Sequence, residues 1–257
     1  MIIDTHTHLD GIEFKEDIQE VVERARNVGV SKVLVPAIDL NSIESINYVC
    51  KLFPNFAYPM LGLHPEEVKD DYQEVLKKMK TVLLENNNYI AVGEIGLDFY
   101  WSREFEKEQL IAFEEQVKWS IETRLPLMIH CRKAQNEMVK ILGKYKDQLP
   151  GGVFHCFTGN EKEAAELLSF DNFVLGIGGV LTFKKSNLPE TLKSVPLQRI
   201  VLETDSPYMA PVPLRGKRNE SSFLIHIVTK LAEVYNTTED EIAIQTNKNV
   251  ERIFGIY

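Results

Sequence analysis

The chain begins with Met1-Ile2-Ile3-Asp4-Thr5-His6-Thr7-His8, a short apolar run that leads into two histidines one residue apart. On a β-strand, residues i and i+2 point to the same face. His6 and His8 are therefore expected to project side by side. The 257 residues include only 6 histidines, and two of them in one tripeptide favour a metal-binding pair. Whether this pair is part of a metal site depends on what other strands bring to the same place.

Apolar runs of this kind recur along the chain and alternate with longer amphipathic stretches. Most are rich in Val, Ile and Leu with little polar alternation, as expected of strands that are covered on both faces. The eight runs are 2–5, 32–37, 57–61, 90–95, 126–131, 152–156, 173–178 and 200–204. Between them, apolar residues return at helical spacing, for example at Leu110, Phe113, Val117 and Ile121.

Eight strand–helix alternations in about 250 residues predict an α/β fold, a (β/α)8 barrel of the TIM type. An open, doubly wound sheet would also fit the alternation, but no glycine-rich phosphate loop follows the first run. No linker, repeat or low-complexity segment divides the chain. We therefore expect residues 1–257 to form a single domain.

The composition is typical of a globular protein, with 44% hydrophobic and 26% charged residues. No apolar run approaches the ~20 residues needed to span a bilayer, and no secretion signal is visible. The 3 cysteines form no CxxC motif and are typical of reduced thiols, so we expect a cytoplasmic protein that does not act at a membrane. The net charge of −9 argues against a general nucleic-acid-binding surface, but it allows one local cationic site.

Side chains that bind metals stand at the ends of five of these strands. Glu94 lies at the end of the fourth run, His130 in the fifth, His155 in the sixth and Asp205 directly after the eighth. Barrel enzymes build their active sites at the C-terminal ends of the strands. The sequence therefore predicts a metal site at the mouth of the barrel, with six candidate ligands: His6, His8, Glu94, His130, His155 and Asp205.

Four imidazoles and two carboxylates are too many for one catalytic metal that keeps an open position. They suit two divalent cations roughly 3.5–4 Å apart, with Glu94 as the bridge between them. Imidazole ligands favour Zn, whereas the carboxylates also admit Mn or Mg, and the sequence does not decide among the three. We expect the first cation to bind His6, His8, Glu94 and Asp205, and the second to bind Glu94, His130 and His155.

Strand periodicity places two further acids one layer below the ligands. Asp4 and Glu203 each precede a candidate ligand by two residues, so both should point inward. We expect each carboxylate to accept the free N–H of a ligating imidazole and to fix its orientation. A structural ion pair or hydrogen bond is the alternative for each. Cys131 and Cys156 directly follow candidate ligands, so they should face away from the site as packing residues.

These motifs resemble those of the TatD-type metal-dependent hydrolases. The stretch 4–10, Asp-Thr-His-Thr-His-Leu-Asp, is similar to the opening signature of that family, and the resemblance covers residues 1–257. Further similar motifs follow in the same order at 62–65, 93–98, 126–132, 155–159, 203–207 and 210–219. Asn136 stands where the family often has an acid, and Ser221 where a proline is common. These two departures bear on substrate preference more than on metal binding.

The resemblance implies a TIM-like barrel with two divalent metals that acts as a phosphodiesterase on DNA. Members of the family are described as deoxyribonucleases, often 3′→5′ exonucleases on single-stranded ends. We therefore expect a single-stranded DNA end as the substrate and no obligate protein partner. The alternative is a metal-dependent hydrolase of an ester or amide, such as an aminoacyl linkage, because the same centre would serve carbonyl chemistry. A metal-binding protein without catalysis is the third possibility.

Residues around the expected mouth receive roles in this hydrolysis. Glu94 and Asp205 are catalytic candidates, and Asp205 would orient the attacking water and accept its proton. His64, in a Gly-x-His-Pro turn, would donate a proton to the leaving group or bind a phosphate. The segment 99–101, Phe-Tyr-Trp, would offer a stacking surface for an end base. The alternative, for at least two of the three, is packing in the core or anchoring of the loop. Phosphate contacts are expected from Arg132, Arg215, Lys217 and Arg218.

Overall fold

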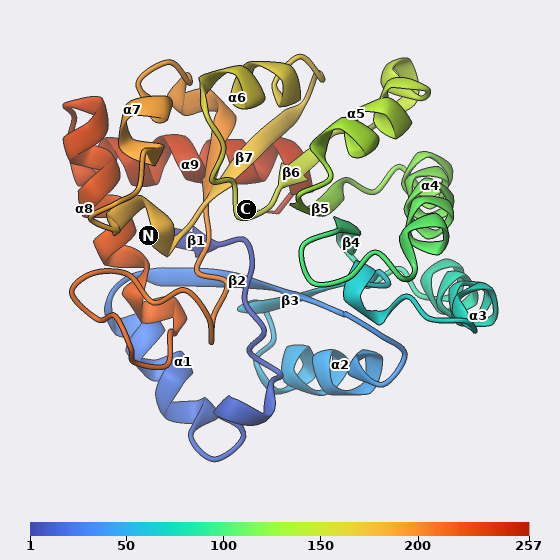
Figure 1. Cartoon of the computed structure of the whole chain (residues 1–257). Helices are drawn as coiled ribbons and strands as arrows, with labels where there is room; N and C mark the ends of the chain where they lie inside the picture. Colours follow the sequence, from blue (N-terminus) through green and yellow to red (C-terminus); the bar gives the residue numbers. More distant parts are fainter. Residues whose placement is uncertain (257) are drawn as a thin grey trace.

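Eight parallel strands lie where the eight apolar runs predict them, in a computed structural model that describes residues 1–256 (Figure 1). The predicted (β/α)8 fold is confirmed. The strands are β1 (Ile2–Asp4), β2 (Val30–Pro36), β3 (Ala57–Met60), β4 (Val92–Asp98), β5 (Leu127–Arg132), β6 (Gly152–Phe154), β7 (Phe173–Ile177) and β8 (Ile200–Leu202).

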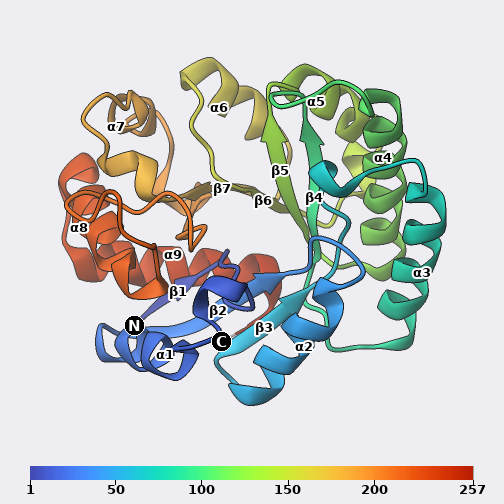
Figure 2. The ribbon, with the colours of Figure 1, turned by 60° about the horizontal axis from the view of Figure 1, so that its bottom comes forward.

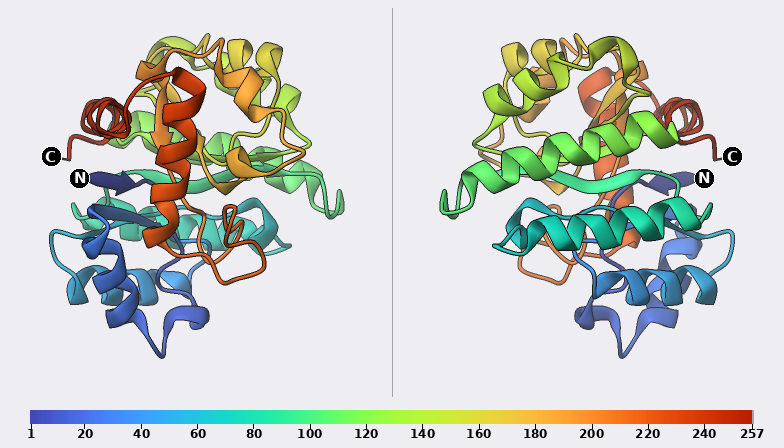
Figure 3. Two further views of the ribbon diagram at one scale, coloured as in Figure 1. Left: turned by 90° about the vertical axis from the view of Figure 1, so that its left-hand side faces the viewer. Right: turned by 90° about the vertical axis from the view of Figure 1, so that its right-hand side faces the viewer.

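Helices α1 to α8 surround these strands (Figures 1 and 2). Their bounds are α1 (Ile18–Asn27), α2 (Ser42–Leu52), α3 (Tyr72–Glu85), α4 (Glu106–Thr123), α5 (Gln135–Gly143), α6 (Glu161–Leu167), α7 (Leu188–Leu192) and α8 (Leu224–Tyr235). A last helix, α9 (Glu239–Phe254), follows α8. Helices α3 and α4 pack side by side outside β4 (Figure 3). Among the described residues, no helix combines the length and the apolar composition that crossing a membrane requires.

The strands pair in the order β1-β2-β3 and β4-β5-β6-β7-β8. Two isolated bridges join the two groups of strands into a ring. Leu61 pairs with Val92 between β3 and β4, and Thr7 pairs with Ser206 beyond the ends of β1 and β8. The second bridge lies within the ligand motifs themselves, so closing the barrel also brings His6 and His8 next to Asp205.

The barrel interior is filled by a ring of apolar side chains that takes one residue from each strand position. The ring comprises Ile3, Leu34, Met60, Ala91, Met128, Val153, Val174 and Val201. Val250 and Phe254 of α9 pack against this ring, and α9 contacts both β1 and β8 (Figure 3). Helix α9 therefore closes one end of the barrel, which leaves the opposite end free for polar chemistry. A second apolar cluster joins the outer faces of the strands to the surrounding helices.

Asp4 does not take the inward position that the periodicity predicts. Its neighbour Ile3 belongs to the interior ring, so Asp4 faces the opposite side of β1. The Asp4 carboxylate accepts the amide of Thr204 at 2.9 Å and the hydroxyls of Thr204 and Ser221 at 2.7 and 2.6 Å. It accepts the backbone amide of His6, not the imidazole. Asp4 therefore joins β1 to the residues after β8.

An ion pair holds α1 against the segment that precedes α8. Arg24 of α1 donates Nε and Nη2 to the two carboxylate oxygens of Glu220, at 2.9 and 2.7 Å. The Glu220 side chain is 6% exposed, and Ser222 also donates to it. Burial alone would raise the pKa of Glu220, but the hydrogen bonds from Arg24 and Ser222 bring it below the usual value. The folded state therefore favours the charged form.

Glu220→Gln should lower the free energy of unfolding by about 1–3 kcal/mol at pH 7, because a hydrogen-bonded charged pair is lost. Since the folded-state pKa of Glu220 is lowered, its contribution is present above the ordinary glutamate pKa of about 4.3 and is lost as the pH falls below it. Urea unfolding in the presence of chelator should show that the difference in the free energy of unfolding between the parent and Glu220→Gln is smaller at pH 4 than at pH 7. Glu190→Gln, which breaks the exposed pair with Lys193, should change little. A gap of equal size at both pH values would contradict the assignment.

Candidate metal centre

The candidate ligands meet at the mouth of the barrel, as the sequence predicts. The rings of His6 and His8 converge although β1 ends at Asp4, and their Nε2 atoms lie 3.3 Å apart. The His6 and His155 rings stack with centroids 3.6 Å apart. The side chains of His6, Glu94 and His155 are 3% exposed or less and form the floor, whereas those of His8, His130 and Asp205 are 17–19% exposed. The site is thus buried below and open above.

The carboxylate of Glu94 lies between two groups of histidines, and each oxygen faces one group. Oε2 lies 3.1 Å from Nε2 of His6 and 3.8 Å from Nε2 of His8. Oε1 lies 3.1 Å from Nδ1 of His130 and 3.4 Å from Nε2 of His64. A carboxylate in this position can give one oxygen to each of two cations.

Asp205 and His155 occupy the side of the site that is shared by both groups. Oδ1 of Asp205 lies 3.6 Å from Nε2 of His8 and 3.6 Å from Nε2 of His155. Nε2 of His155 also lies 3.8 Å from Oε1 of Glu94. Nδ1 of His155 lies 3.0 Å from Oε2 of Glu203, which is the contact that strand spacing predicts for this acid. With Nδ1–H donated to Glu203, the lone pair of Nε2 faces the site.

His130 is held by an acid that the sequence analysis missed. Nε2 of His130 lies 2.9 Å from Oδ2 of Asp98, so with that proton donated, Nδ1 is left to face Glu94. Asp98 follows Glu94 by four residues on the same strand. Residues four apart on a strand share a face, so the periodicity that starts at Glu94 could have predicted that Asp98 faces the site.

His64 lies beside His130 near Glu94, but its ring nitrogens have different partners from those of His130. Its Nδ1 accepts the backbone amide of Glu66 at 3.2 Å. A neutral imidazole that accepts at Nδ1 carries its proton on Nε2, and Nε2 faces Glu94. This arrangement suits a proton donor better than a metal ligand.

Local backbone features place these ligands. Gly96 has φ +150°, and a Cβ there would overlap the carbonyl oxygen of His130, so only glycine lets β4 approach β5 at this level. Asp205 has φ 56°, a left-handed conformation that aspartate tolerates better than most residues. Cys156 has φ 48°, so strand parity no longer holds there. Its thiol, expected to face away, lies in one group with His155 and Asp205, their candidate ligand atoms within 4.8 Å of one another.

The charges of the site support one another. Burial alone would raise the pKa of Glu94, but His6, His64 and His130 bring it well below its usual range. Burial alone would lower the pKa of His130, but Asp98 and Glu94 raise it to about 9. Glu94 is therefore ionised at neutral pH. Without a cation, the raised pKa of His130 means that this imidazole is protonated, so a cation that binds there would displace its proton.

The donor atoms fit divalent metals. Nε2 of His6, His8 and His155 and Nδ1 of His130 point into one small volume with the Glu94 and Asp205 carboxylates. Nε2 of His6 and Nε2 of His8 are close enough for one hydrogen bond when either carries a proton. Imidazole and carboxylate groups together are a preferred ligand set for Zn or Mn. Nδ1 of His6 is buried and has no hydrogen-bond partner among residues 1–256.

The four expected phosphate contacts differ in availability. Arg132 lies on the rim next to the centre, and Lys217 is exposed. The guanidinium of Arg215 lies 3.9 Å from the Phe183 ring centroid and donates to the Ala210 carbonyl.

Arg218 is already paired with an acid within the fold. Its guanidinium donates to both carboxylate oxygens of Asp17, at 2.9 and 2.6 Å, and it packs over the Phe14 ring. This pairing compensates its charge within the fold, so a phosphate would have to compete with Asp17 for Arg218.

Comparisons with known proteins identify relatives of this chain. The sequence model of the TatD-related DNases matches residues 3–255. The chain is 36% identical to an uncharacterized metal-dependent hydrolase, YabD, of Bacillus subtilis over 100% of both chains. It is 30% identical to the 3′-5′ ssDNA/RNA exonuclease TatD of Yersinia pseudotuberculosis over 99% of this chain and 100% of the relative. The crystal structure of YJJV, a TatD homologue from Escherichia coli, superposes with a TM-score of 0.92 at 28% identity, covering 100% of this chain and 98% of that one.

Glu94→Ala should lower the occupancy of both cations, because each would lose one carboxylate oxygen. Elemental analysis after equilibration with Mn or Zn should show less than one ion per chain, against two for the parent. His226→Ala, which changes a histidine on α8 outside the site, should retain both ions. Two ions retained by the Glu94 variant would overturn the bridging role.

Asp98→Asn should weaken binding of the cation at the His130 end alone. Loss of a carboxylate that orients a ligating histidine typically lowers metal affinity about 10- to 100-fold. Competitive chelation should therefore remove one ion from this variant at a lower chelator concentration and leave the other unchanged. Equal loss of both ions would show that Asp98 stabilises the whole site and does not act through His130 alone.

Proposed function

The chain belongs to the family of TatD-related DNases and is a metal-dependent hydrolase, and we propose that it is a two-metal 3′→5′ exonuclease on single-stranded DNA. The observation that carries the two-metal proposal is the position of Glu94, with one carboxylate oxygen toward His6 and the other toward His130. One relative is named as an exonuclease on ssDNA and RNA, which supports a nucleic-acid substrate.

Two divalent cations would polarise the scissile phosphate and make a water molecule acidic enough to attack at neutral pH. In our proposal, His6, His8, Glu94 and Asp205 hold the first cation. Glu94, His130 and His155 hold the second. The near-complete burial of Glu94 and the partial exposure of the ligands above it leave the reacting phosphate only one direction of approach, from solvent.

Asp205 orients the attacking water and accepts its proton. Its carboxylate is partly exposed, and its Oδ1 lies 3.6 Å from Nε2 of His8 and of His155. Burial alone would raise the pKa of Asp205, but His155, His8 and His6 hold it well below its usual range. The carboxylate is therefore ionised and able to accept a hydrogen bond from water at neutral pH.

His64 donates a proton to the departing 3′-oxygen. Its Nε2–H points into the site because Nδ1 accepts the Glu66 amide. The side chain is 12% exposed and stands next to His130, with ring centroids 4.6 Å apart. A general acid in this position would complete the pair of proton transfers that phosphodiester hydrolysis needs.

A 5′-labelled single-stranded oligodeoxynucleotide should be shortened to a ladder of labelled products in Mg or Mn, and chelation should abolish the reaction. The ladder reports removal from the 3′ end, because attack from the 5′ end would release the label at once. Asp205→Asn should lower kcat at least about 100-fold, the usual contribution of an acid–base group. His226→Ala should behave as the parent.

Parallel assays with RNA and with an aminoacyl or simple ester substrate decide between the candidate reactions. Turnover of the ester without release of nucleotides would overturn the nuclease proposal and favour the carbonyl hydrolase. Internal cuts in a circular single strand would overturn the exonuclease direction.

A further inference from the structure

An exposed group of three flat side chains stands beside the metal centre. It consists of Tyr100 and Trp101, after β4, and Arg132, at the end of β5, and is called the rim platform below. Trp101 is 69% exposed and Tyr100 is 48% exposed, whereas Phe99 beside them is buried. The guanidinium carbon of Arg132 lies 3.7 Å from the Tyr100 ring centroid. The Tyr100 and Trp101 rings meet edge to face, with centroids 4.8 Å apart.

The rim platform is tied to the metal centre through one carboxylate. Oδ1 of Asp98 accepts the backbone amide of Tyr100 at 2.8 Å, and Oδ2 faces Nε2 of His130 at 2.9 Å. Arg132 follows His130 by two residues on the same strand. The platform is therefore held at a fixed place next to a candidate ligand.

A cleft of about 720 Å³ connects the platform with the centre. Tyr100 and Arg132 line one part of it and His155 another. The first residues of α5 also line it, so the positive end of that helix adds to the local potential. Its charged lining residues are three cations against two acids: Arg103, Arg132, Lys133, Glu137 and Glu163.

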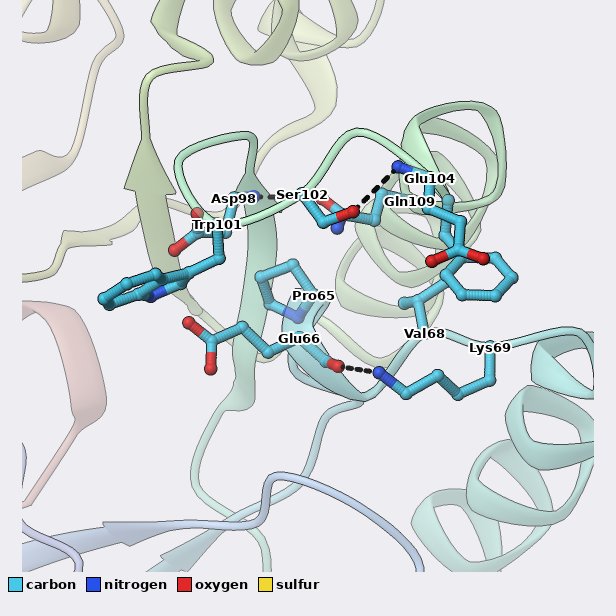
Figure 4. Close-up of a pocket in the computed structure, with 10 residues that line it drawn as sticks. Pro65, Glu66, Val68, Lys69, Asp98, Trp101, Ser102, Glu104 and Gln109 are labelled. Carbon is cyan, nitrogen blue, oxygen red and sulfur yellow. Dashed lines mark hydrogen bonds between the residues drawn. The ribbon is translucent and has the colours of Figure 1, made fainter.

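The other side of the platform is acidic. Figure 4 shows a smaller pocket, of about 350 Å³, in which the indole of Trp101 projects away from Gln109 and the Glu66 carboxylate lies on the facing side. Its charged lining residues are one cation against three acids: Lys69, Glu66, Asp98 and Glu104. A chain of phosphates is attracted to the basic cleft and repelled from this pocket.

The far side of the mouth also has an exposed aromatic ring, but its charges are wrong for a polyanion. Tyr208 is 56% exposed and lies near His8. Burial and the charges of Glu13, Asp205 and Glu66 raise the pKa of its hydroxyl. Of these two places at the mouth, the rim platform is the one where a cation lies directly against an exposed ring.

We propose that the rim platform stacks a nucleobase next to the scissile phosphate, while the neighbouring phosphates of the strand lie in the basic cleft. This inference rests on the proposed function, because it takes a polynucleotide as the substrate. Every base offers a flat π face, and arginine stacks on bases as aromatic rings do, so the platform binds bases with little regard to their identity. A terminal residue that lacks its base cannot use it.

The test compares Trp101→Ala with the parent on two oligothymidylates, one with a normal 3′ end and one with an abasic 3′-terminal residue. Stacking on one aromatic residue contributes on the order of a 10-fold effect. Trp101→Ala should therefore raise KM about 10-fold on the normal strand, with a smaller change in kcat. The abasic end should raise the parent's KM similarly, and the two changes together should raise it no further. Tyr48→Ala, which removes a 65% exposed ring on α2, should have no effect.

Fluorescence provides a second readout that does not require turnover. The chain has 2 tryptophans, and Trp119 is 1% exposed, so emission that responds to ligand arises from Trp101. Titration of the metal-loaded protein with a phosphorothioate oligothymidylate should quench this emission, and Trp101→Phe should abolish the response.

The two proposals fail in different ways. Nucleotide release by the parent with no KM change in Trp101→Ala and no quenching would overturn the platform alone. Saturable quenching without nucleotide release would overturn the exonuclease and leave the platform as a binding site. Additive effects of Trp101→Ala and the abasic end would show that the ring acts on something other than the terminal base, and would also overturn the platform.

Discussion

The structure depends on one buried carboxylate. Glu94 is almost fully removed from water, and an ionised carboxylate in such a place is tolerated only when its charge is compensated. The compensation comes from histidines on both sides, with one oxygen of Glu94 facing His6 and the other facing His130. Two histidines of the site are in turn held from outside, because Asp98 lies against Nε2 of His130 and Glu203 against Nδ1 of His155. Acid, imidazole and acid thus alternate, and each group fixes the tautomer of the next.

The barrel makes this arrangement possible by separating apolar and polar layers. One apolar residue from each strand position fills the interior, and α9 covers the end of the barrel below it. The ligands follow this ring along the strands and meet where the chain leaves the sheet. Because water is excluded below and admitted above, the polar groups interact strongly with one another and remain open to a substrate on one side only.

Much of this was predictable from local pattern. The apolar runs locate all eight strands, and acids and histidines at their ends locate the ligands, because both signals depend on single strands. The failures have a common cause, since each depends on contacts between distant segments. Asp4 accepts hydrogen bonds from Thr204 and Ser221, about 200 residues later, and Arg218 pairs with Asp17, about 200 residues earlier. The face of Asp98 was predictable from periodicity, but its contact with His130 was not, because His130 is on the neighbouring strand.

The net charge of −9 makes the distribution of charge around the mouth important. Fixed charges act over a Debye length of about 8 Å at physiological salt, so a polyanion that approaches this surface is attracted locally, for example near the cations of the cleft beside His155. A long duplex lying across the mouth would meet the acids around Tyr208 and also those of the pocket that Trp101 lines. A single strand entering by its end would place few phosphates on the molecule, and those few would lie in the basic cleft. The arrangement of charge therefore supports the proposed entry of a strand by its end, and this support is independent of the chemistry proposed at Glu94.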